Sequence, residues 1–131
     1  MACNTTVIVS AYPEVRHRLS ELVASAGLGA RTVSSLENWL EATEPETDAC
    51  LVLDAGVGEL LEPGRLASFA SVCARIPVLV LIDRGDIPTA VRAIKHGAAE
   101  VLQKPFRDRN LLACLKRMVD GWGEGAMGAT C

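Results

Sequence analysis

The chain has 131 residues, which fits one domain, and half of them are apolar while only 4% are aromatic, so an aliphatic core is expected. The formal net charge of −3 gives no broad attraction to nucleic acid, and we expect no direct nucleic-acid binding. The longest apolar run, 78–82, is too short to span a bilayer, and the first residues lack the features of a signal peptide. We therefore expect a cytoplasmic protein without membrane contact.

The first half of the chain alternates short β-branched runs with amphipathic segments. Strands are predicted at 6–10, 30–33 and 49–53. A helix is predicted between the first two strands, with Pro13 in its first turn and glycines 27 and 29 at its end. Ser34 and Glu37 have the spacing of a capping box, which predicts a second helix that stops before Pro45.

The same alternation continues in the second half. A helix around 66–74 precedes an apolar run at 77–82, whose lack of polar alternation is typical of a strand covered on both faces. Asp86 and Pro88 open the next helix and Gly97 ends it. The residues expected to face inward from that helix are Ala90, Val91 and Ile94.

A short strand at 100–102 and a last helix complete the pattern. Asp108 is the expected cap of that helix. Its expected inner face consists of Leu111, Leu112, Leu115, Met118 and Val119. Residues 121–131 are glycine-rich and aperiodic, which predicts a tail or the start of a linker after one domain at 1–120.

Five strand–helix repeats predict an α/β fold, with a five-stranded parallel sheet in a doubly wound (βα)5 sandwich of the flavodoxin-like type. Sites in such sheets form beyond the carboxyl ends of the strands. The candidate site residues are therefore those that end or directly follow a strand: Ser10, Ala11, Asp54, Ile82, Asp83 and Lys104.

Asp54 and Lys104 are two charged residues that this fold brings together. They have two interpretations. One is a structural ion pair at the end of the sheet, and the other is a nucleophilic aspartate beside a lysine that stabilises a transferred phosphoryl group. The two residues alone leave both interpretations open. Five cysteines, with no CxxC pair and no histidine at ligand spacing, predict no metal site of their own.

Two segments around these residues carry a family resemblance. They are LVLD, which ends at Asp54, and PVLVLIDRGDIPTAVRAIKHGAAEVLQKPF, which contains Lys104 and Pro105. Together they resemble the receiver domain of two-component response regulators, a CheY-like domain, in its FixJ-type branch. The resemblance covers roughly 5–122 and implies that Asp54 is the phosphoacceptor and that Lys104 contacts the phosphoryl group.

The resemblance also implies partners. Receiver domains are signalling modules rather than enzymes, and we expect this one to meet a sensor histidine kinase or a downstream regulator. Homodimers of the family often form through the fourth and fifth helices. The resemblance therefore adds a homodimer through these helices as one option for this chain.

The chain departs from the receiver pattern at several positions. Receivers have two adjacent acidic residues after the first strand, which hold Mg²⁺, and here Ser10 and Ala11 stand there. The hydroxyl residue that ends the fourth strand is replaced by Ile82, and the aromatic residue of the fifth strand by Val101. The loop after the phosphoacceptor is replaced by AGVGELLEPG.

These departures predict an atypical receiver that acts mainly through protein–protein contacts. We expect no cofactor, or weak Mg²⁺ binding by Asp54 and Asp83 at most. Two alternatives remain open on the sequence. One is a working receiver that a histidine kinase phosphorylates on Asp54, and the other is a small ligand-binding α/β protein.

Overall fold

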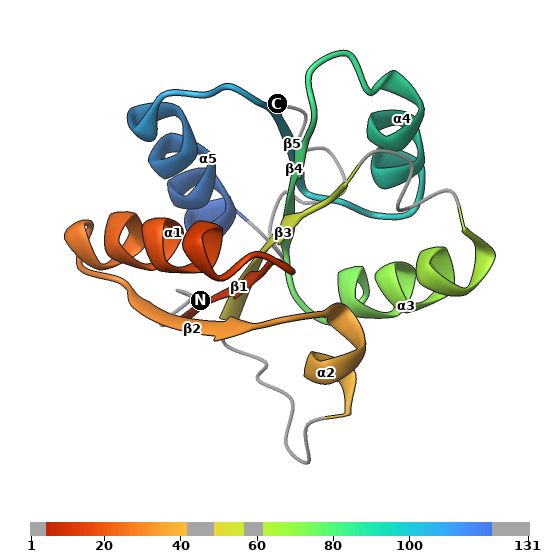
Figure 1. Cartoon of the computed structure of the whole chain (residues 1–131), viewed down its shortest axis with the longest axis horizontal. Helices are drawn as coiled ribbons and strands as arrows, with labels where there is room; N and C mark the ends of the chain where they lie inside the picture. The colour runs from red at the N-terminus through yellow and green to blue at the C-terminus, as the bar shows by residue number, and fades with distance from the viewer. Residues whose placement is uncertain (1–4, 42–48, 57–61, 122–131) are drawn as a thin grey trace.

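The computed structural model describes residues 5–41, 49–56 and 62–121, and it contains five strand–helix repeats (Figure 1). The strands are β1 (Thr5–Val9), β2 (Gly29–Val33), β3 (Ala49–Asp54), β4 (Val78–Ile82) and β5 (Glu100–Gln103). The helices are α1 (Pro13–Ser25), α2 (Leu36–Leu40), α3 (Pro63–Cys73), α4 (Ile87–Lys95) and α5 (Asp108–Gly121).

The strands form one parallel sheet in the order β2-β1-β3-β4-β5. From β1 the chain moves outward to β2 and then returns past β1 to β3, so the direction of winding reverses between β1 and β3. The predicted doubly wound parallel sheet is therefore confirmed. A reversal of this kind opens a crevice at the carboxyl ends of the two strands, where α/β proteins place their sites.

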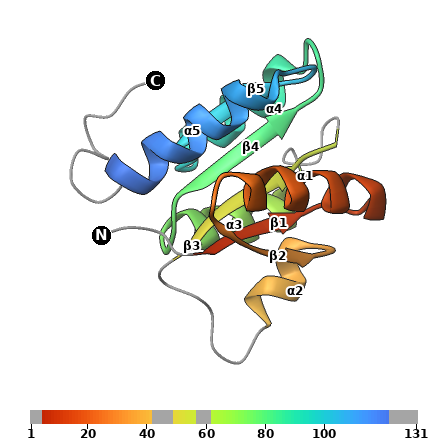
Figure 2. The ribbon, with the colours of Figure 1, turned by 90° about the vertical axis from the view of Figure 1, so that its left-hand side faces the viewer.

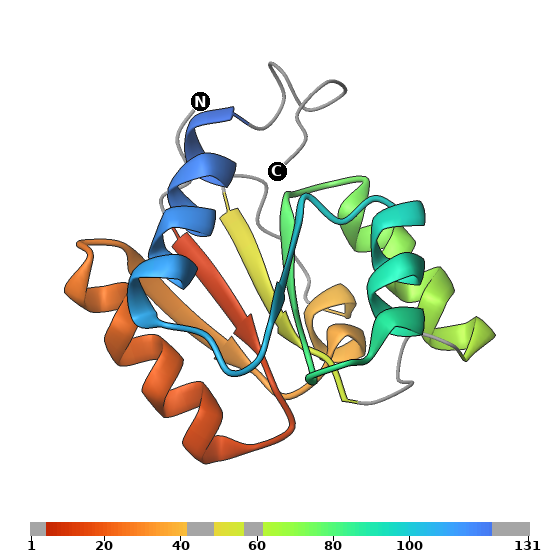
Figure 3. The same cartoon turned by 90° about the horizontal axis from the view of Figure 1, so that it is seen from above.

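Helices cover both faces of the sheet. α1 and α5 lie on one face, in front of the strands in Figure 2, and α2, α3 and α4 lie on the other (Figures 1 and 3). Side chains alternate along each strand, so Ile8 and Val52 pack toward α1 and α5, while Val9 and Leu53 pack toward α2 and α3. Because both faces are buried, the central strands are mostly apolar, and the exceptions are Thr5 and Thr6 in β1 and Asp54 in β3.

Local signals explain most helix ends. Asp86 caps α4, because its Oδ1 accepts the Thr89 amide at 3.3 Å. The cap predicted for α2 was one residue early: Ser35, not Ser34, accepts the amide of Asn38, at 3.1 Å. The Ser34 hydroxyl accepts the Asn38 side-chain amide instead, at 2.6 Å.

Two details of the later helices also differ from the prediction or extend it. Asp108 is the first helical residue of α5 rather than its cap, and its charge in the first turn still suits the helix dipole. Gly97 ends α4 with a φ of +109°, and a Cβ there would lie 3.0 Å from the Cβ of Cys73. α3 and the end of α4 therefore meet at a position where only glycine fits.

The orientation of α4 was predicted wrongly for two residues. Val91 and Ile94 were expected to face inward, but they are 45% and 56% exposed, and Ile87 is 59% exposed. The residues of α4 that are fully buried are Thr89 and Ala93. Periodicity identifies which residues share a helix face, but it does not identify the face that packs on the sheet. Thr89 and Ala93 are smaller than Val91 and Ile94, so the helix approaches the sheet more closely on their side.

Cysteines in the described ranges are part of the core. Cys50, Cys73 and Cys114 are buried, and burial raises the pKa of the Cys73 thiol to about 12. Cys3, Cys131 and the predicted tail lie outside the described residues, apart from Gly121. Over those same ranges, no helix combines the length and apolar character needed to cross a membrane.

Candidate functional site

The register of the sheet brings the candidate residues together. Val9 is opposite Leu53 in the β1–β3 pair, so the next residues along, Ser10 and Asp54, meet at the carboxyl edge. Ile82 is opposite Gln103 in the β4–β5 pair, so Asp83 and Lys104 meet in the same way. The four neighbouring strands β1, β3, β4 and β5 thus each contribute one polar side chain to this edge of the sheet.

Asp54 lies at the centre of this cluster and both of its carboxylate oxygens are engaged. The Ser10 hydroxyl donates to Oδ2 at 2.9 Å, and the Lys104 ammonium donates to Oδ1. The Asp54 side chain is only 5% exposed. A carboxylate this deeply buried needs such partners, because burial without them strongly disfavours its charge.

Ser10 is held in a fixed position. Its hydroxyl accepts the Tyr12 amide at 3.1 Å while it donates to Asp54, and its own amide donates to the carbonyl of Val33. The Arg16 guanidinium donates to the Ser10 carbonyl from α1. The serine is thus an integral hydrogen-bonded part of the site.

Lys104 bridges two carboxylates. Its ammonium contacts Asp54 and also donates to Oδ1 of Asp83 at 3.3 Å. Burial acts to lower the pKa of Lys104, but the hydrogen bond and charge of Asp54 and those of Asp83 outweigh it, and the pKa is raised. Lys104 is therefore a permanent cation at neutral pH.

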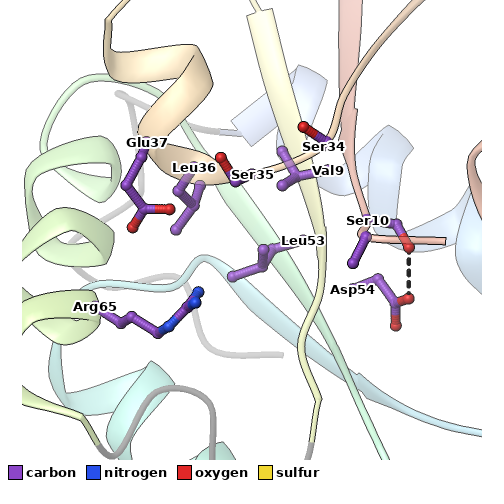
Figure 4. A pocket seen from close by; sticks show the side chains of 10 residues that line it. Val9, Ser10, Ser34, Ser35, Leu36, Glu37, Leu53, Asp54 and Arg65 are labelled. Atoms are coloured by element: carbon purple, nitrogen blue, oxygen red, sulfur yellow. Dashed lines mark hydrogen bonds between the residues drawn. The ribbon is translucent and has the colours of Figure 1, made fainter.

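A small hollow adjoins the site on the side of α2 and α3. Its volume is about 130 Å³, and Figure 4 shows Arg65 reaching toward it from α3, with the Ser10–Asp54 hydrogen bond at its far end. Ser34, Ser35 and Glu37 line it from the start of α2. Typical ligand pockets occupy roughly 300–1,000 Å³, so the hollow gives little support to the ligand-binding alternative.

Comparison with known proteins assigns this arrangement to a family. The chain is 38% identical over 98 residues to Nodulation protein W of Bradyrhizobium diazoefficiens, covering 75% of the chain and 43% of that protein. It is 33% identical over 102 residues to the transcriptional regulatory protein FixJ of Azorhizobium caulinodans, covering 78% and 48%. The crystal structure of FixJ-N superposes with a TM-score of 0.78 at 26% identity, covering 92% of this chain and 97% of that one.

The chain belongs to the response-regulator receiver family, as a CheY-like domain of the FixJ type. No model of a protein family matches it. It spans about half the length of the curated relatives that it matches. The family resemblance stated from the sequence is thus confirmed for the fold and for the receiver domain.

The other four candidate site residues do not contact Asp54 through polar side-chain groups, and they differ in burial. Ile82 is buried and packs into the core on the side of α2, α3 and α4, and Val101 packs against that core. Ala11 and Pro105 are exposed, and Pro105 follows a cis peptide bond. None of these four residues presents a side-chain hydrogen-bonding group to Asp54.

The donor set at Asp54 does not fit Mg²⁺. Mg²⁺ prefers an octahedral shell of carboxylate and water oxygens. Here the two carboxylates, Asp54 and Asp83, share the Lys104 ammonium, and the remaining donor near Asp54 is the Ser10 hydroxyl. In the part of the chain that the structure describes, no group of three or more His, Cys, Asp or Glu residues could hold a metal ion.

Sequence reasoning missed three polar contacts. The Ser10–Asp54 hydrogen bond and the Asp83–Lys104 ion pair were not anticipated, although strand ends had singled out all four residues. The third contact joins Arg117 of α5 to Glu100 at the start of β5, with distances of 3.0 and 3.2 Å. A glutamate at the start of a buried strand was a usable signal, because such a carboxylate requires a partner.

Proposed function

We propose that this receiver is a pseudo-receiver, in which phosphorylation of Asp54 is absent or slow and signalling depends on protein–protein contacts. The observation that carries the proposal is the engagement of both Asp54 oxygens by Ser10 and Lys104. An incoming phosphoryl group would meet a carboxylate whose two oxygens each already accept a hydrogen bond.

The charges around Asp54 add a second barrier to phosphorylation. A phosphoryl group brings negative charge that a metal ion normally offsets. The residues described above are poorly suited to bind that ion, and the Asp83 carboxylate accepts a hydrogen bond from the same Lys104 ammonium that contacts Asp54. Removing preorganised charge stabilisation of this kind commonly lowers a rate by about 10²–10³-fold.

Protein contacts are supported by an exposed apolar surface. Ile87, Val91 and Ile94 form one exposed face of α4, which we call the α4 stripe. Exposed cations near it along the chain are Arg84 in the preceding turn and Arg92 and Lys95 on α4. An aliphatic stripe with basic neighbours complements a protein surface that combines aliphatic side chains with carboxylates, and we propose a downstream regulator with such a surface as its partner.

The homodimer through α4 and α5 is a weaker candidate for the same surface. In a two-fold interface like residues meet only near the axis, so a dimer centred on the α4 stripe would bring the cations beside the stripe close to their own copies. We therefore expect self-association to be weak at low salt and to strengthen as salt screens the repulsion. Sedimentation velocity at about 20 mM and 500 mM NaCl tests this, and a tight dimer at low salt would replace the acidic partner in this proposal.

The test of the phosphorylation proposal is an intact-mass measurement after incubation with acetyl phosphate and Mg²⁺. We expect no phosphoryl adduct on the native protein. Asp54→Asn is the control for an adduct at other residues. An adduct that appears on the native protein and is absent from Asp54→Asn would establish a working phosphoacceptor and contradict the proposal.

A restored acidic pair makes the same experiment sharper. The double variant Ser10→Asp, Ala11→Asp places two carboxylates after β1, as in other receivers. It also removes the hydroxyl that donates to Asp54. We expect this variant to gain a Mg²⁺-dependent adduct that the native protein lacks. If it stays folded, as judged by its thermal transition, and gains no adduct, the altered residues at the end of β1 are not what limits phosphorylation.

A further inference from the structure

Lys104 divides its charge between two acids that belong to different parts of the fold. Asp54 ends the central strand β3 and is nearly completely buried, whereas Asp83 begins the turn after β4 and is partly exposed. The Lys104 amide also donates to the Ile82 carbonyl at 2.9 Å, which fixes the backbone beside that turn. One ammonium therefore links the centre of the sheet to the turn from Asp83 to Asp86.

This turn leads directly into α4. The Asp83 carbonyl accepts the Asp86 amide at 3.0 Å, and Gly85 accepts the Ile87 amide at 2.8 Å. Asp86 then caps the helix through the amide of Thr89, and its own carbonyl accepts the amide of Ala90. A displacement of Asp83 is thus transmitted to the first turn of α4 through backbone and capping hydrogen bonds.

We propose that Asp83 is an internal anion that competes with Asp54 for Lys104 and thereby positions α4 and its exposed stripe. The ion pair between Asp83 and Lys104 holds the turn against the end of the sheet. This ion pair forms between residues of the chain itself and needs no phosphoryl group. The α4 stripe is therefore held in one orientation. The consequence for partner binding rests on the proposed function, whereas the positioning of α4 does not.

The competition predicts opposite effects from two similar substitutions. Asp83→Asn removes the anchor of the turn, so the first turn of α4 should open more often. Asp54→Asn removes the competitor, so Lys104 should pair more strongly with Asp83 and the same turn should open less often. A purely structural role for both acids would instead loosen the turn in each variant.

Amide hydrogen exchange, followed by NMR on the full chain, measures this opening. The probes are the amides of Ile87, Thr89 and Ala90, which hydrogen-bond to Gly85 and Asp86. A partly exposed ion pair implies a change of about two- to five-fold. We expect exchange to be faster by that factor in Asp83→Asn and slower in Asp54→Asn.

Two further variants complete the design. Asp108→Asn removes an acid from the exposed pair with Arg18, 3.5 Å apart, and should leave α4 exchange unchanged. Asp83→Glu keeps the charge and should restore protection relative to Asp83→Asn.

Equal exchange in Asp83→Asn and the native protein would overturn the inference, and so would faster exchange in Asp54→Asn. No phosphodonor or partner is present, so this result is independent of the phosphorylation test.

Discussion

Helices α4 and α5 flank the same edge of the sheet on opposite faces, and they use similar apolar patterns in different ways. α5 buries Leu111 and Leu115 completely against the sheet and α1. α4 buries Thr89 and Ala93 and leaves Ile87 and Ile94 exposed. An apolar helix face is therefore not by itself a core face, and the exposed one becomes a candidate for partner contact.

The largest expected effect on the free energy of unfolding comes from the buried face of α5. Leu115→Ala should lower the free energy of unfolding by about 2–5 kcal/mol, because it removes buried methyl groups and leaves a cavity. Urea denaturation followed by circular dichroism measures this value. A loss below about 1 kcal/mol would mean that α5 is packed more loosely than its burial indicates.

The ion pair of α5 is the next test. Glu100 is 5% exposed and Arg117 holds it with two hydrogen bonds, so Arg117→Met would leave a buried carboxylate without this partner. We expect a loss of about 1–3 kcal/mol in urea denaturation. Arg18→Met is the matched control, since its exposed pair with Asp108 should contribute about 0–1 kcal/mol. Equal losses in both variants would contradict the importance of burial here.

Lys104 lies between α4 and α5 in the chain, and its ion pairs should make the free energy of unfolding depend on pH. Its pKa is raised above the ordinary value of 10.5, so its ion pairs contribute stability below that pH and lose it as the pH rises through the folded pKa. Lys104→Met should cost about 1–2 kcal/mol at pH 8, and this cost should shrink at higher pH.

Urea denaturation at pH 8 and pH 11 checks this, with Lys116→Met on the exposed side of α5 as the control. A cost of Lys104→Met that does not change over this range would show that the ammonium charge is not what stabilises the site.

The smallest effect is expected on α4. Ile94→Ala should change the free energy of unfolding by less than about 0.5 kcal/mol, because the side chain is already largely in water. The same urea series that includes Leu115→Ala measures it. A loss comparable to that of Leu115→Ala would mean that Ile94 is buried in solution and that the α4 stripe is not available to a partner.

Much of the fold could be predicted from the sequence because its signals are local. Apolar runs such as 78–82 and the glycine at the end of α4 indicate strands and helix ends without reference to the rest of the chain. Asp54 and Lys104 could be placed together because both follow strands, and parallel strands end at one edge. The orientation of α4 could not be predicted, since it depends on how closely Thr89 and Ala93 approach the sheet.

The contacts within the site depend on the register of the strands, which local sequence patterns do not reveal. Strand ends identified Ser10 and Asp83 as site residues, but not which group each would contact. Ser10 was expected to be a poor substitute for an acidic metal ligand, and in the fold it is a donor to Asp54. Asp83 was expected to bind Mg²⁺ weakly at most, and in the fold it pairs with Lys104.

The close approach of Gly97 to Cys73 has a consequence for how this sequence can change over evolutionary time. With a positive φ and a Cβ position already 3.0 Å from a neighbour, position 97 excludes side chains for two independent reasons. Substitutions there cannot be rescued by shrinking position 73 alone, because the backbone strain would remain. The junction of α3 and α4 should therefore stay constant in descendants of this chain, while the exposed stripe a few residues earlier is under no such backbone constraint.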